Sequence, residues 1–325
     1  MGLFAVTGAG GFIGGHLVER LLGDGHRVRA LVRYSSTSSI GFLDSARARH
    51  PEALEIVHGD VEDPACMVRL IDGCERVLHL AALIGIPYSF VAPHHYVQTN
   101  LMGTLNVLEA ARAAGVERLV HISTSETYGT AQFVPITEAH PAHAQSPYAA
   151  TKVGADQLAL SYQRSFGLPV VVVRPFNTYG PRQSPRAFIP TVIAQALAGD
   201  VIRMGSLDPR RDLNYVTDTV QGMVAAAITP GVEGAEINIG SGVSHSIGDV
   251  ARAIIERVNP SARIELDPAR VRPGASEVME LVAGIERAGE LLGYAPSVPL
   301  EAGIERVIEH MRTDADLRHA GEYHV

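Results

Sequence analysis

A tyrosine and a lysine four residues apart, Tyr148 and Lys152, have the types and spacing needed for proton transfer. On a helix, residues at this spacing lie on the same face. A phenol with a pKa near ~10 is a poor base at neutral pH, and a neighbouring ammonium favours its ionised form. We therefore expect Tyr148, assisted by Lys152, to remove the proton of a sugar or alcohol hydroxyl.

A second polar segment lies upstream, at Ser123-Thr124-Ser125-Glu126. Thr124 is the expected hydrogen-bonding partner of the reacting oxygen, and Ser123 is the alternative. Glu126 adds a carboxylate that could act as a general base, or it could be a solvated loop residue, as single carboxylates mostly are. Together the two segments predict chemistry beyond the movement of a hydride.

The N-terminal residues predict the elements that must position this chemistry. An apolar run at 3–7 suits a buried strand, and it is followed by Gly8-Ala-Gly-Gly11-Phe12-Ile13-Gly14 and a helical pattern. This order predicts a dinucleotide-binding loop. Gly8 permits the tight turn, Gly11 lets the backbone approach a pyrophosphate, and Gly14 lets the helix pack on the strand. The N–H groups at the helix start would then bind the phosphates.

Strand and helix patterns alternate through the first half of the chain. The expected strands are 3–7, 27–32, 54–58, 76–80, 118–122 and 169–174, and the expected helices are about 12–23, 64–72, 94–114 and 147–167. This alternation predicts an α/β fold, a Rossmann-like doubly wound parallel sheet with helices on both faces.

A looser pattern, rich in proline and glycine, begins after residue 175, and a strand at 236–240 is expected to return to the sheet. We therefore predict two interleaved parts. One is a dinucleotide-binding domain at 1–175 plus about 215–240. The other is a smaller α/β substrate-binding lobe at about 176–214 plus 241–325.

Composition excludes several classes of protein. With 27 basic and 35 acidic residues the net charge is −8, which argues against a nucleic-acid binder. No apolar run approaches the ~18 residues of a membrane span, and a first strand at residue 3 leaves no room for a signal peptide, so a cytoplasmic location is expected. Cys66 and Cys74 form no metal motif and the histidines are scattered, so we expect no metal site.

Further motifs follow in a recognisable order. They are Gly59-Asp60, His79-Leu-Ala-Ala82, Ser123 to Gly129, Tyr148 to Lys152, Arg174 to Pro181, Arg211 to Val216 and Arg272-Pro-Gly. With the glycine loop, these motifs resemble the extended short-chain dehydrogenase/reductase superfamily, in its nucleotide-sugar epimerase and dehydratase branch. The resemblance covers almost the whole chain and implies a nucleotide-diphosphate sugar as substrate and a tightly held, recycled NAD(P).

The residue at the position of Glu126 distinguishes the epimerases of that branch from its dehydratases. Epimerases usually carry a small residue at this position, whereas dehydratases carry acidic residues around it. Thr124-Ser125-Glu126 resembles the GDP-mannose 4,6-dehydratase pattern more than the dTDP-glucose one, in which an aspartate stands where Ser125 is. The stretches 126–132, 145–148 and 181–183 also resemble bacterial dehydratases of the legionaminic-acid pathway, which act on a nucleotide-linked N-acetylglucosamine.

The resemblance therefore implies an NDP-sugar 4,6-dehydratase. Tyr148 would take the 4-hydroxyl proton while the nicotinamide takes the C4 hydride, Glu126 would remove the C5 proton, water would leave from C6, and the hydride would return to C6. Protonation of the leaving hydroxyl falls to Glu126 or to a water. The alternatives are an NDP-sugar 4-epimerase, in which Glu126 is incidental, and a non-catalytic nucleotide-binding regulator.

Other site residues are implied by the same resemblance. Asn177 would contact the substrate diphosphate, Arg211 and Arg272 would clamp it with their planar guanidinium groups, and Ser125 would contact the sugar. The implied cofactor contacts, besides the glycine loop with Phe12 and Ile13, are Asp60, Val61, Leu80, Ala81, Tyr148 and Lys152.

The choice between NAD and NADP depends on the end of the second strand. NAD-binding relatives usually place an acid there to hold the ribose hydroxyls. Here the strand ends at Arg33-Tyr-Ser35-Ser36 with no acid. Arg33 with Ser35 or Ser36 suits a 2′-phosphate, so NADP is favoured, although hydroxyls can also hold the ribose of NAD.

Helix pairing in relatives implies a homodimer, because helices corresponding to 94–114 and 147–167 form a four-helix bundle across a two-fold axis. Leu101, Leu105 and Leu108 could supply its apolar faces. Alternatively, these residues pack on the sheet.

Overall fold

The computed structural model describes residues 1–270 and 279–313. Its main element is a seven-stranded parallel sheet with the order β10-β6-β5-β4-β1-β2-β3. The strands are β1 (Leu3–Thr7), β2 (Arg27–Arg33), β3 (Leu54–Gly59), β4 (Arg76–His79), β5 (Arg118–Ile122), β6 (Val170–Pro175) and β10 (Glu236–Ile239). Strand order runs outward in opposite directions from β1 and β4, so the sheet is doubly wound, as predicted.

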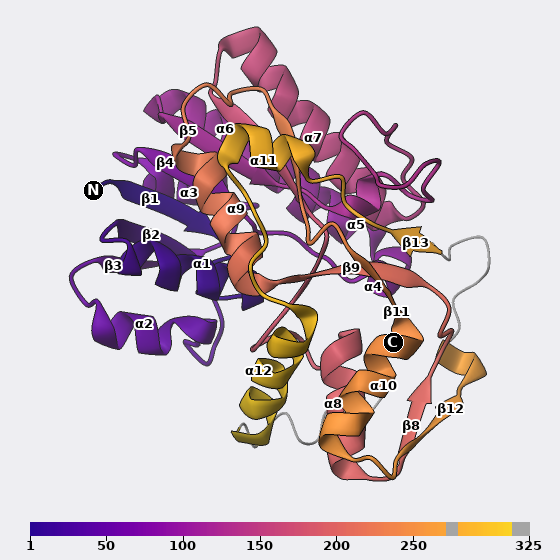
Figure 1. Cartoon of the computed structure of the whole chain (residues 1–325). Coiled ribbons are helices and arrows are strands. Elements are labelled where there is room, and N and C mark those ends of the chain that lie inside the picture. Colours follow the sequence, from indigo (N-terminus) through magenta and orange to yellow (C-terminus); the bar gives the residue numbers. More distant parts are fainter. Residues whose placement is uncertain (271–278, 314–325) are drawn as a thin grey trace.

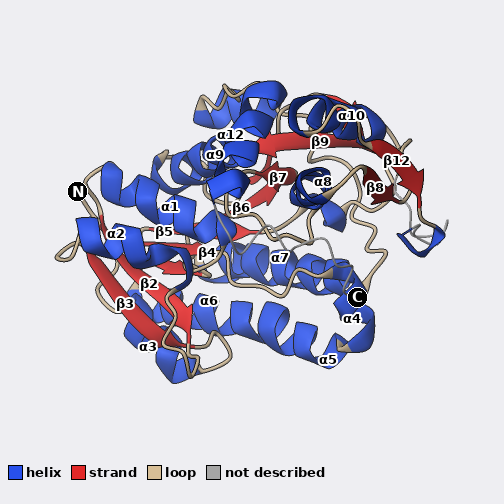
Figure 2. Ribbon diagram, turned by 90° about the horizontal axis from the view of Figure 1, so that it is seen from below, coloured by secondary structure: helices blue, strands red, loops and turns tan. Residues whose placement is uncertain are grey.

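Helices cover both faces of this sheet (Figures 1 and 2). One face carries α1 (Phe12–Gly23) and α9 (Val216–Ile228), which contact each other, and the other carries α3 (Pro64–Ile71), α6 (Gly103–Ala114) and α7 (Pro147–Phe166). The valines of β6 alternate between two buried clusters, because neighbouring side chains of a strand point to opposite faces. Burial on both faces explains the uninterrupted apolar run of this strand.

The predicted helix at 94–114 is broken into three segments. They are α5 (Pro93–Tyr96), the π-helical turn η2 (Val97–Met102) and α6, and they follow two shorter helices that the sequence did not indicate, α2 (Asp44–Arg49) and α4 (Ile86–Val91). The π turn contains the buried Asn100, whose side chain bonds the backbone of Leu83 in the loop after β4. A contact distant in sequence therefore interrupts the α-helical ladder.

Most of the remaining described segments build a second lobe beside the carboxyl edge of the sheet (Figure 1). Its strands are β7 (Asn177–Tyr179), β8 (Val201–Met204), β9 (Arg210–Tyr215), β11 (Ser244–Ser246), β12 (Arg263–Leu266) and β13 (Glu280–Leu281), and its helices are α8 (Phe188–Ala198), α10 (Ile247–Val258) and α12 (Leu300–Thr313). Helix α11 (Glu286–Leu292) lies instead against α9 and β10 of the main sheet domain. Short 3-10 turns are η1 (Gly41–Leu43), η3 (Ser125–Thr127) and η4 (Pro268–Arg270).

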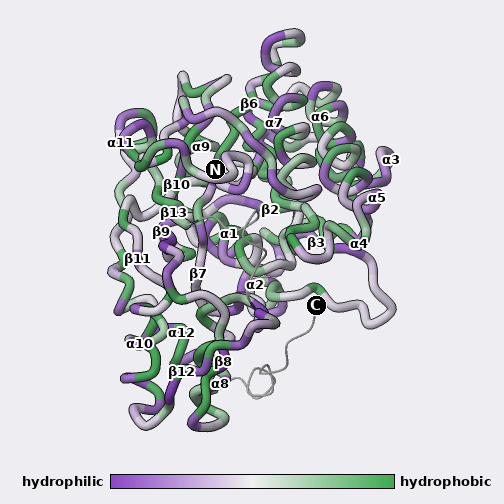
Figure 3. The backbone as a smooth tube through the Cα atoms, turned by 90° about the vertical axis from the view of Figure 1, so that its right-hand side faces the viewer, coloured by the Kyte–Doolittle hydropathy of each residue, from purple (hydrophilic) through white to green (hydrophobic). Residues whose placement is uncertain are grey.

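Two small sheets organise this lobe. Strand β9 pairs with β7, β11 and β13, and β8 pairs with β12. Figure 3 shows hydrophobic stretches, in green, along α8 and α10, which pack against each other. β10 returns to the main sheet beside β6, as predicted, whereas the domain bounds given above stay a prediction.

No helix within residues 1–270 and 279–313 is both long and apolar enough to cross a membrane. The same residues contain no group of three or more His, Cys, Asp or Glu side chains that could hold a metal ion.

Candidate active site

The carboxyl edge of the parallel sheet gathers most of the predicted site residues. β1 leads into the glycine turn, β4 into Leu80, β5 into Ser123, and β6 into the segment that contains Asn177. Strand ends at the point where the order reverses form a crevice in which α/β proteins bind ligands. Parallel pairing therefore brings together residues that are far apart in sequence.

The glycine turn has no room for side chains. Gly8 has φ +69°, and a Cβ there would lie 2.9 Å from the backbone nitrogen of Ala81. A Cβ on Gly14 would lie 2.1 Å from the carbonyl oxygen of Gly8. Gly11 caps α1 without a side chain, so the first N–H groups of the helix face the turn free of a side-chain cap. These features fit a dinucleotide phosphate, which binds backbone N–H groups at a helix start.

A hydrogen-bonded threonine fixes the neighbouring residues Leu80 and Ala81. The Oγ1 of Thr7 accepts hydrogen bonds from both of their backbone N–H groups at 3.1 Å. Its own proton therefore goes to Nδ1 of His79, 2.8 Å away, and His79 Nε2–H donates to Thr104 Oγ1 at 3.1 Å. Burial holds the pKa of His79 well below its usual value, so the ring is a neutral structural link. The sequence predicts no role for His79 beyond its place in a motif.

The predicted ribose-binding residues lie along the same edge. Arg33 ends β2, is exposed and pairs in register with Gly59. Ser36 is also exposed, and Ser35 hydrogen-bonds to Thr37 at 3.1 Å. The next strand end presents Asp60, whose carboxylate accepts from the backbone of Glu62, and the buried Val61. Phe12 and Ile13 occupy the first turn of α1, partly buried.

Tyr148 and Lys152 lie on the first turns of α7, as their spacing predicts. Ser146 caps this helix by accepting from the backbone of Ala149 at 3.1 Å. Tyr148 is 7% exposed and Lys152 is 3% exposed. The ammonium of Lys152 donates to the carbonyl of Ile122, at the end of β5, at 2.7 Å. This bond joins α7 to the strand that carries the second predicted segment.

Burial changes the acidity of both groups. It lowers the pKa of Lys152 to about 8, and it raises the pKa of the Tyr148 phenol above its usual value. The direction for Tyr148 is opposite to that predicted from its spacing to Lys152, because desolvation of the buried phenol disfavours its ionised form. A hydrogen bond with Thr124 works the other way, and the negative charge of Glu126 raises the pKa of the phenol further.

The turn after β5 brings Thr124 and Glu126 to this phenol. Thr124 Oγ1 accepts from the backbone N–H of Glu126 at 3.2 Å and is hydrogen-bonded with Tyr148. Glu126 is half-buried, so it is not the fully solvated loop residue that was the alternative. Ser123 and Ser125 are buried, and the Ser123 hydroxyl has no hydrogen-bond partner. Thr124, rather than Ser123, is therefore the hydrogen-bonding partner of Tyr148.

Two features of this site were not predicted. Asn100, in the π turn, is completely buried and donates to Thr151 Oγ1 at 3.1 Å, and Thr151 in turn donates to the carbonyl of Tyr148 at 2.7 Å. Lys152 is also the single lysine of the chain, since every other one of the 27 basic residues is arginine. The second feature was readable from the sequence, and it indicates that position 152 requires an amine that can titrate.

The predicted substrate residues lie where β7 meets β9. Asn177 donates to the carbonyl of Asp212 at 3.3 Å, and Arg211 precedes that residue on β9. The buried Asp212 carboxylate accepts from Ser241, Gly242 and Ala283, which joins three segments of the lobe. Arg272 lies outside the described residues.

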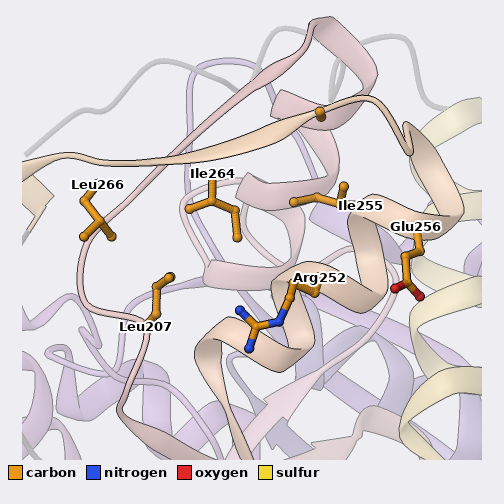
Figure 4. A pocket seen from close by; sticks show the side chains of 7 residues that line it. Leu207, Arg252, Ile255, Glu256, Ile264 and Leu266 are labelled. Atoms are coloured by element: carbon orange, nitrogen blue, oxygen red, sulfur yellow. The ribbon is translucent and has the colours of Figure 1, made fainter.

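A hollow of about 400 Å³ lies elsewhere, between α10 and β12 (Figure 4). Its lining residues are Leu207, Arg252, Ile255, Glu256, Ala262, Ile264 and Leu266. None of them belongs to the predicted site, so this hollow is separate from the residues around Tyr148.

Comparisons with known proteins agree with the motifs. A family model described as GDP-mannose 4,6 dehydratase matches residues 5–307. A UDP-glucose 4-epimerase of Mycolicibacterium smegmatis is 34% identical over 94% of this chain and 97% of its own length. A dTDP-glucose 4,6-dehydratase of an Actinoplanes species is 34% identical over 95% of this chain and 97% of its own length.

A solved structure agrees over a similar span. That of DesIV, a dTDP-glucose 4,6-dehydratase from Streptomyces venezuelae with NAD and TYD bound, has a TM-score of 0.86 at 28% identity, covering 99% of this chain and 100% of that one. The similar proteins also include a UDP-glucuronic acid decarboxylase. The predicted resemblance is thus confirmed.

Substituting Gly14 tests the glycine turn. In Gly14→Ala the new methyl would lie 2.1 Å from the carbonyl oxygen of Gly8, so the turn must shift. We expect the free energy of unfolding to fall by about 1–3 kcal/mol and the affinity for NAD(P) to fall at least about tenfold. Titration calorimetry with both dinucleotides and thermal unfolding would measure this. Gly23→Ala, on the same helix with nothing within 4 Å of its Cβ, is the matched control and should bind like the parent protein. Unchanged binding by Gly14→Ala would contradict the assignment of the turn.

Proposed function

The chain belongs to the GDP-mannose 4,6-dehydratase family, in the nucleotide-sugar branch of the extended short-chain dehydrogenase/reductases, and from this premise we propose that it is an NDP-sugar 4,6-dehydratase. The product would be the 4-keto-6-deoxy form of a nucleotide-linked hexose or N-acetylhexosamine. Enzymes named among its relatives are dehydratases, epimerases and a decarboxylase of nucleotide sugars, which supports an enzyme of this group.

One cluster carries the proposal. Thr124 hydrogen-bonds both to the backbone of Glu126 and to the phenol of Tyr148, and the charge of Glu126 acts on that phenol. Tyr148, the proton acceptor for the sugar hydroxyl, therefore lies on α7, and the carboxylate of Glu126 lies on the short turn that faces this helix. Oxidation at C4 needs only the first group, whereas elimination across C5 and C6 needs a second base. Glu126 supplies it.

The residues then have distinct roles. Tyr148 accepts the proton of the 4-hydroxyl, and Thr124 positions that oxygen. Lys152 places a positive charge near the phenol, which opposes the effect of burial on its ionisation. Glu126 removes the C5 proton, which the 4-ketone makes acidic, and Glu126 or a water protonates the hydroxyl that leaves from C6. A proton from water returns to C5 when the hydride returns to C6. A nicotinamide cofactor, when bound, supplies hydride acceptance at C4 and hydride return at C6.

The dinucleotide would be held by the glycine turn, by Asp60 and Val61, and by the backbone around Leu80 and Ala81. Solved relatives bind NAD, which supports a nicotinamide cofactor. We favour NADP because the exposed Arg33 ends β2 with two serines nearby and no acid. At the other end of the crevice, Asn177 and Arg211 would bind the diphosphate of the sugar nucleotide. The family resemblance implies the same role for Arg272, which is outside the described residues.

A 4-epimerase is the second candidate, because a UDP-glucose 4-epimerase is 34% identical to the chain. An epimerase needs the tyrosine, the lysine and Thr124, but no base at C5. Glu126 therefore distinguishes the two activities.

A homodimer through α6 and α7 is part of the proposal. Large apolar side chains are exposed along the segment that leads into α6, among them Val91, Val97 and Met102. Leu108, in contrast, is fully buried, and Leu101 and Leu105 are only partly exposed. Exposed apolar side chains of this size favour burial against a second copy.

Replacing Glu126 tests the dehydratase directly. In Glu126→Gln we expect loss of water elimination by about 10²–10⁴-fold with C4 oxidation retained, because only the base at C5 is removed. Product mass spectrometry would follow elimination, and absorbance of the reduced nicotinamide would follow oxidation. Tyr148→Phe is the control and should lose both steps. A Glu126→Gln enzyme that eliminates water at the parental rate would contradict the role of Glu126.

Replacing Arg33 tests the dinucleotide preference. Arg33→Ala should weaken NADP binding about tenfold and leave NAD binding unchanged, since only the 2′-phosphate contact is lost. Calorimetric titration with each dinucleotide measures the two affinities. Arg27→Ala, at the exposed start of the same strand, should change neither. An equal loss for both dinucleotides would argue against a 2′-phosphate contact.

Light scattering after size exclusion tests the dimer. The parent protein should have twice the 34.7 kDa mass of one chain, and Met102→Glu, at a residue that is 40% exposed, should give monomers because a buried charge opposes association. Leu266→Glu, at an even more exposed leucine on β12, should remain dimeric. A monomeric parent protein at micromolar concentration would rule out the dimer.

A further inference from the structure

A third ionisable residue continues the catalytic face of α7. Asp156 follows Lys152 by four residues, as Lys152 follows Tyr148, so the three side chains lie along one face of the helix. Asp156 is 1% exposed. A buried carboxylate is costly unless cations or donors compensate it. Its partners therefore indicate what it does.

Two neighbouring strands supply those partners. The Nε and Nη2 atoms of Arg174, on β6, donate to Oδ2 of Asp156 at 3.1 and 3.0 Å. Nε2 of His121, on β5, lies 3.3 Å from Oδ1. Burial alone would raise the pKa of Asp156, but His121 and the charges of Arg174 and Lys152 outweigh it and hold the pKa below its usual value. Asp156 is therefore a fixed negative charge.

Two buried histidines, His121 and His79, do not neutralise the negative charge of Asp156. Burial, together with the charge of Lys152, lowers the pKa of His121 to about 4, so the imidazole is neutral at physiological pH. The ring of His79, on β4, lies 5.6 Å from that of His121 and is neutral for the same reason. The negative charge of Asp156 is thus available to Arg174 and Lys152.

Arg174 has partners besides Asp156. It pairs with Glu236, on β10, and donates to the hydroxyl of Tyr128 at 3.0 Å. Asp156 does not have to compensate Arg174 alone. For Lys152, burial lowers the pKa, and the charge of Asp156 opposes that effect.

We propose that Asp156 is a positioning residue of the active site, whose buried carboxylate, held by Arg174, keeps the Lys152 ammonium charged beside Tyr148. The inference rests on the roles proposed for Tyr148 and Lys152. It does not depend on which sugar the enzyme takes.

The single lysine of the chain makes a direct test possible. Protein labelled with 13C at the lysine side chains gives one lysine Cε resonance, which belongs to Lys152, and its titration from pH 6 to 11 reports the charge of the amine. In the parent protein we expect a pKa of about 8. In Asp156→Asn we expect it to fall by about one pH unit or more, because a nearby opposite charge is lost.

Glu236→Gln is the matched control. It removes a carboxylate that also pairs with Arg174 but belongs to another strand, so the Lys152 titration should stay parental. Asp156→Glu keeps the charge and should restore most of the parental pKa. If Asp156→Asn does not fold, Asp156→Ser provides the neutral test, since its smaller side chain leaves room for a water beside Arg174.

An unchanged Lys152 titration in the folded neutral variant would overturn the inference, as would an equal shift in Glu236→Gln. The titration requires no sugar nucleotide. Failure of dehydration in the parent protein would therefore count against the proposed function alone, and dehydration with an unresponsive Lys152 would count against the role of Asp156 alone.

Discussion

Burial of one ammonium group, that of Lys152, is the constraint on which the site depends. Moving its pKa from 10.5 to about 8 corresponds to about 3 kcal/mol of net cost for the charged form in the folded protein. That net cost is what remains after the carboxylate of Asp156 has offset part of the cost of burial, and the ammonium also donates to the carbonyl of Ile122. A chain that uses arginine at every other basic position keeps lysine here.

The surrounding fold holds this group and its neighbours in register. Parallel pairing places the ends of β5 and β6 side by side, and α7 crosses them so that its buried face presents Tyr148 and Lys152. Asn100 joins α7 to the loop after β4, and Thr7 with His79 joins that loop to the glycine turn. The crevice is thus lined by segments linked through buried hydrogen bonds, which are strong in a low dielectric.

Local periodicity explains what could be predicted from the sequence. Four-residue spacing put Tyr148 and Lys152 on one helix face, apolar runs marked the strands, and three glycines marked the turn. Three unpredicted features depend on contacts distant in sequence: the π turn at Asn100, the pairing of Asp156 with Arg174, and the raised pKa of Tyr148. Desolvation of the Tyr148 phenol depends on the side chains packed around it, and the sequence spacing between Tyr148 and Lys152 does not describe that packing.

The measurement that tests the central claim is the mass of the product. The purified protein would be incubated with UDP-, GDP-, CDP- and dTDP-linked hexoses and N-acetylhexosamines, with UDP-glucuronic acid included. A product lighter by one water from one of these nucleotides is the predicted result. A product of unchanged mass that chromatographs as the C4 epimer, or one lighter by carbon dioxide from the glucuronic acid, would contradict the dehydratase and leave Glu126 without the role proposed for it.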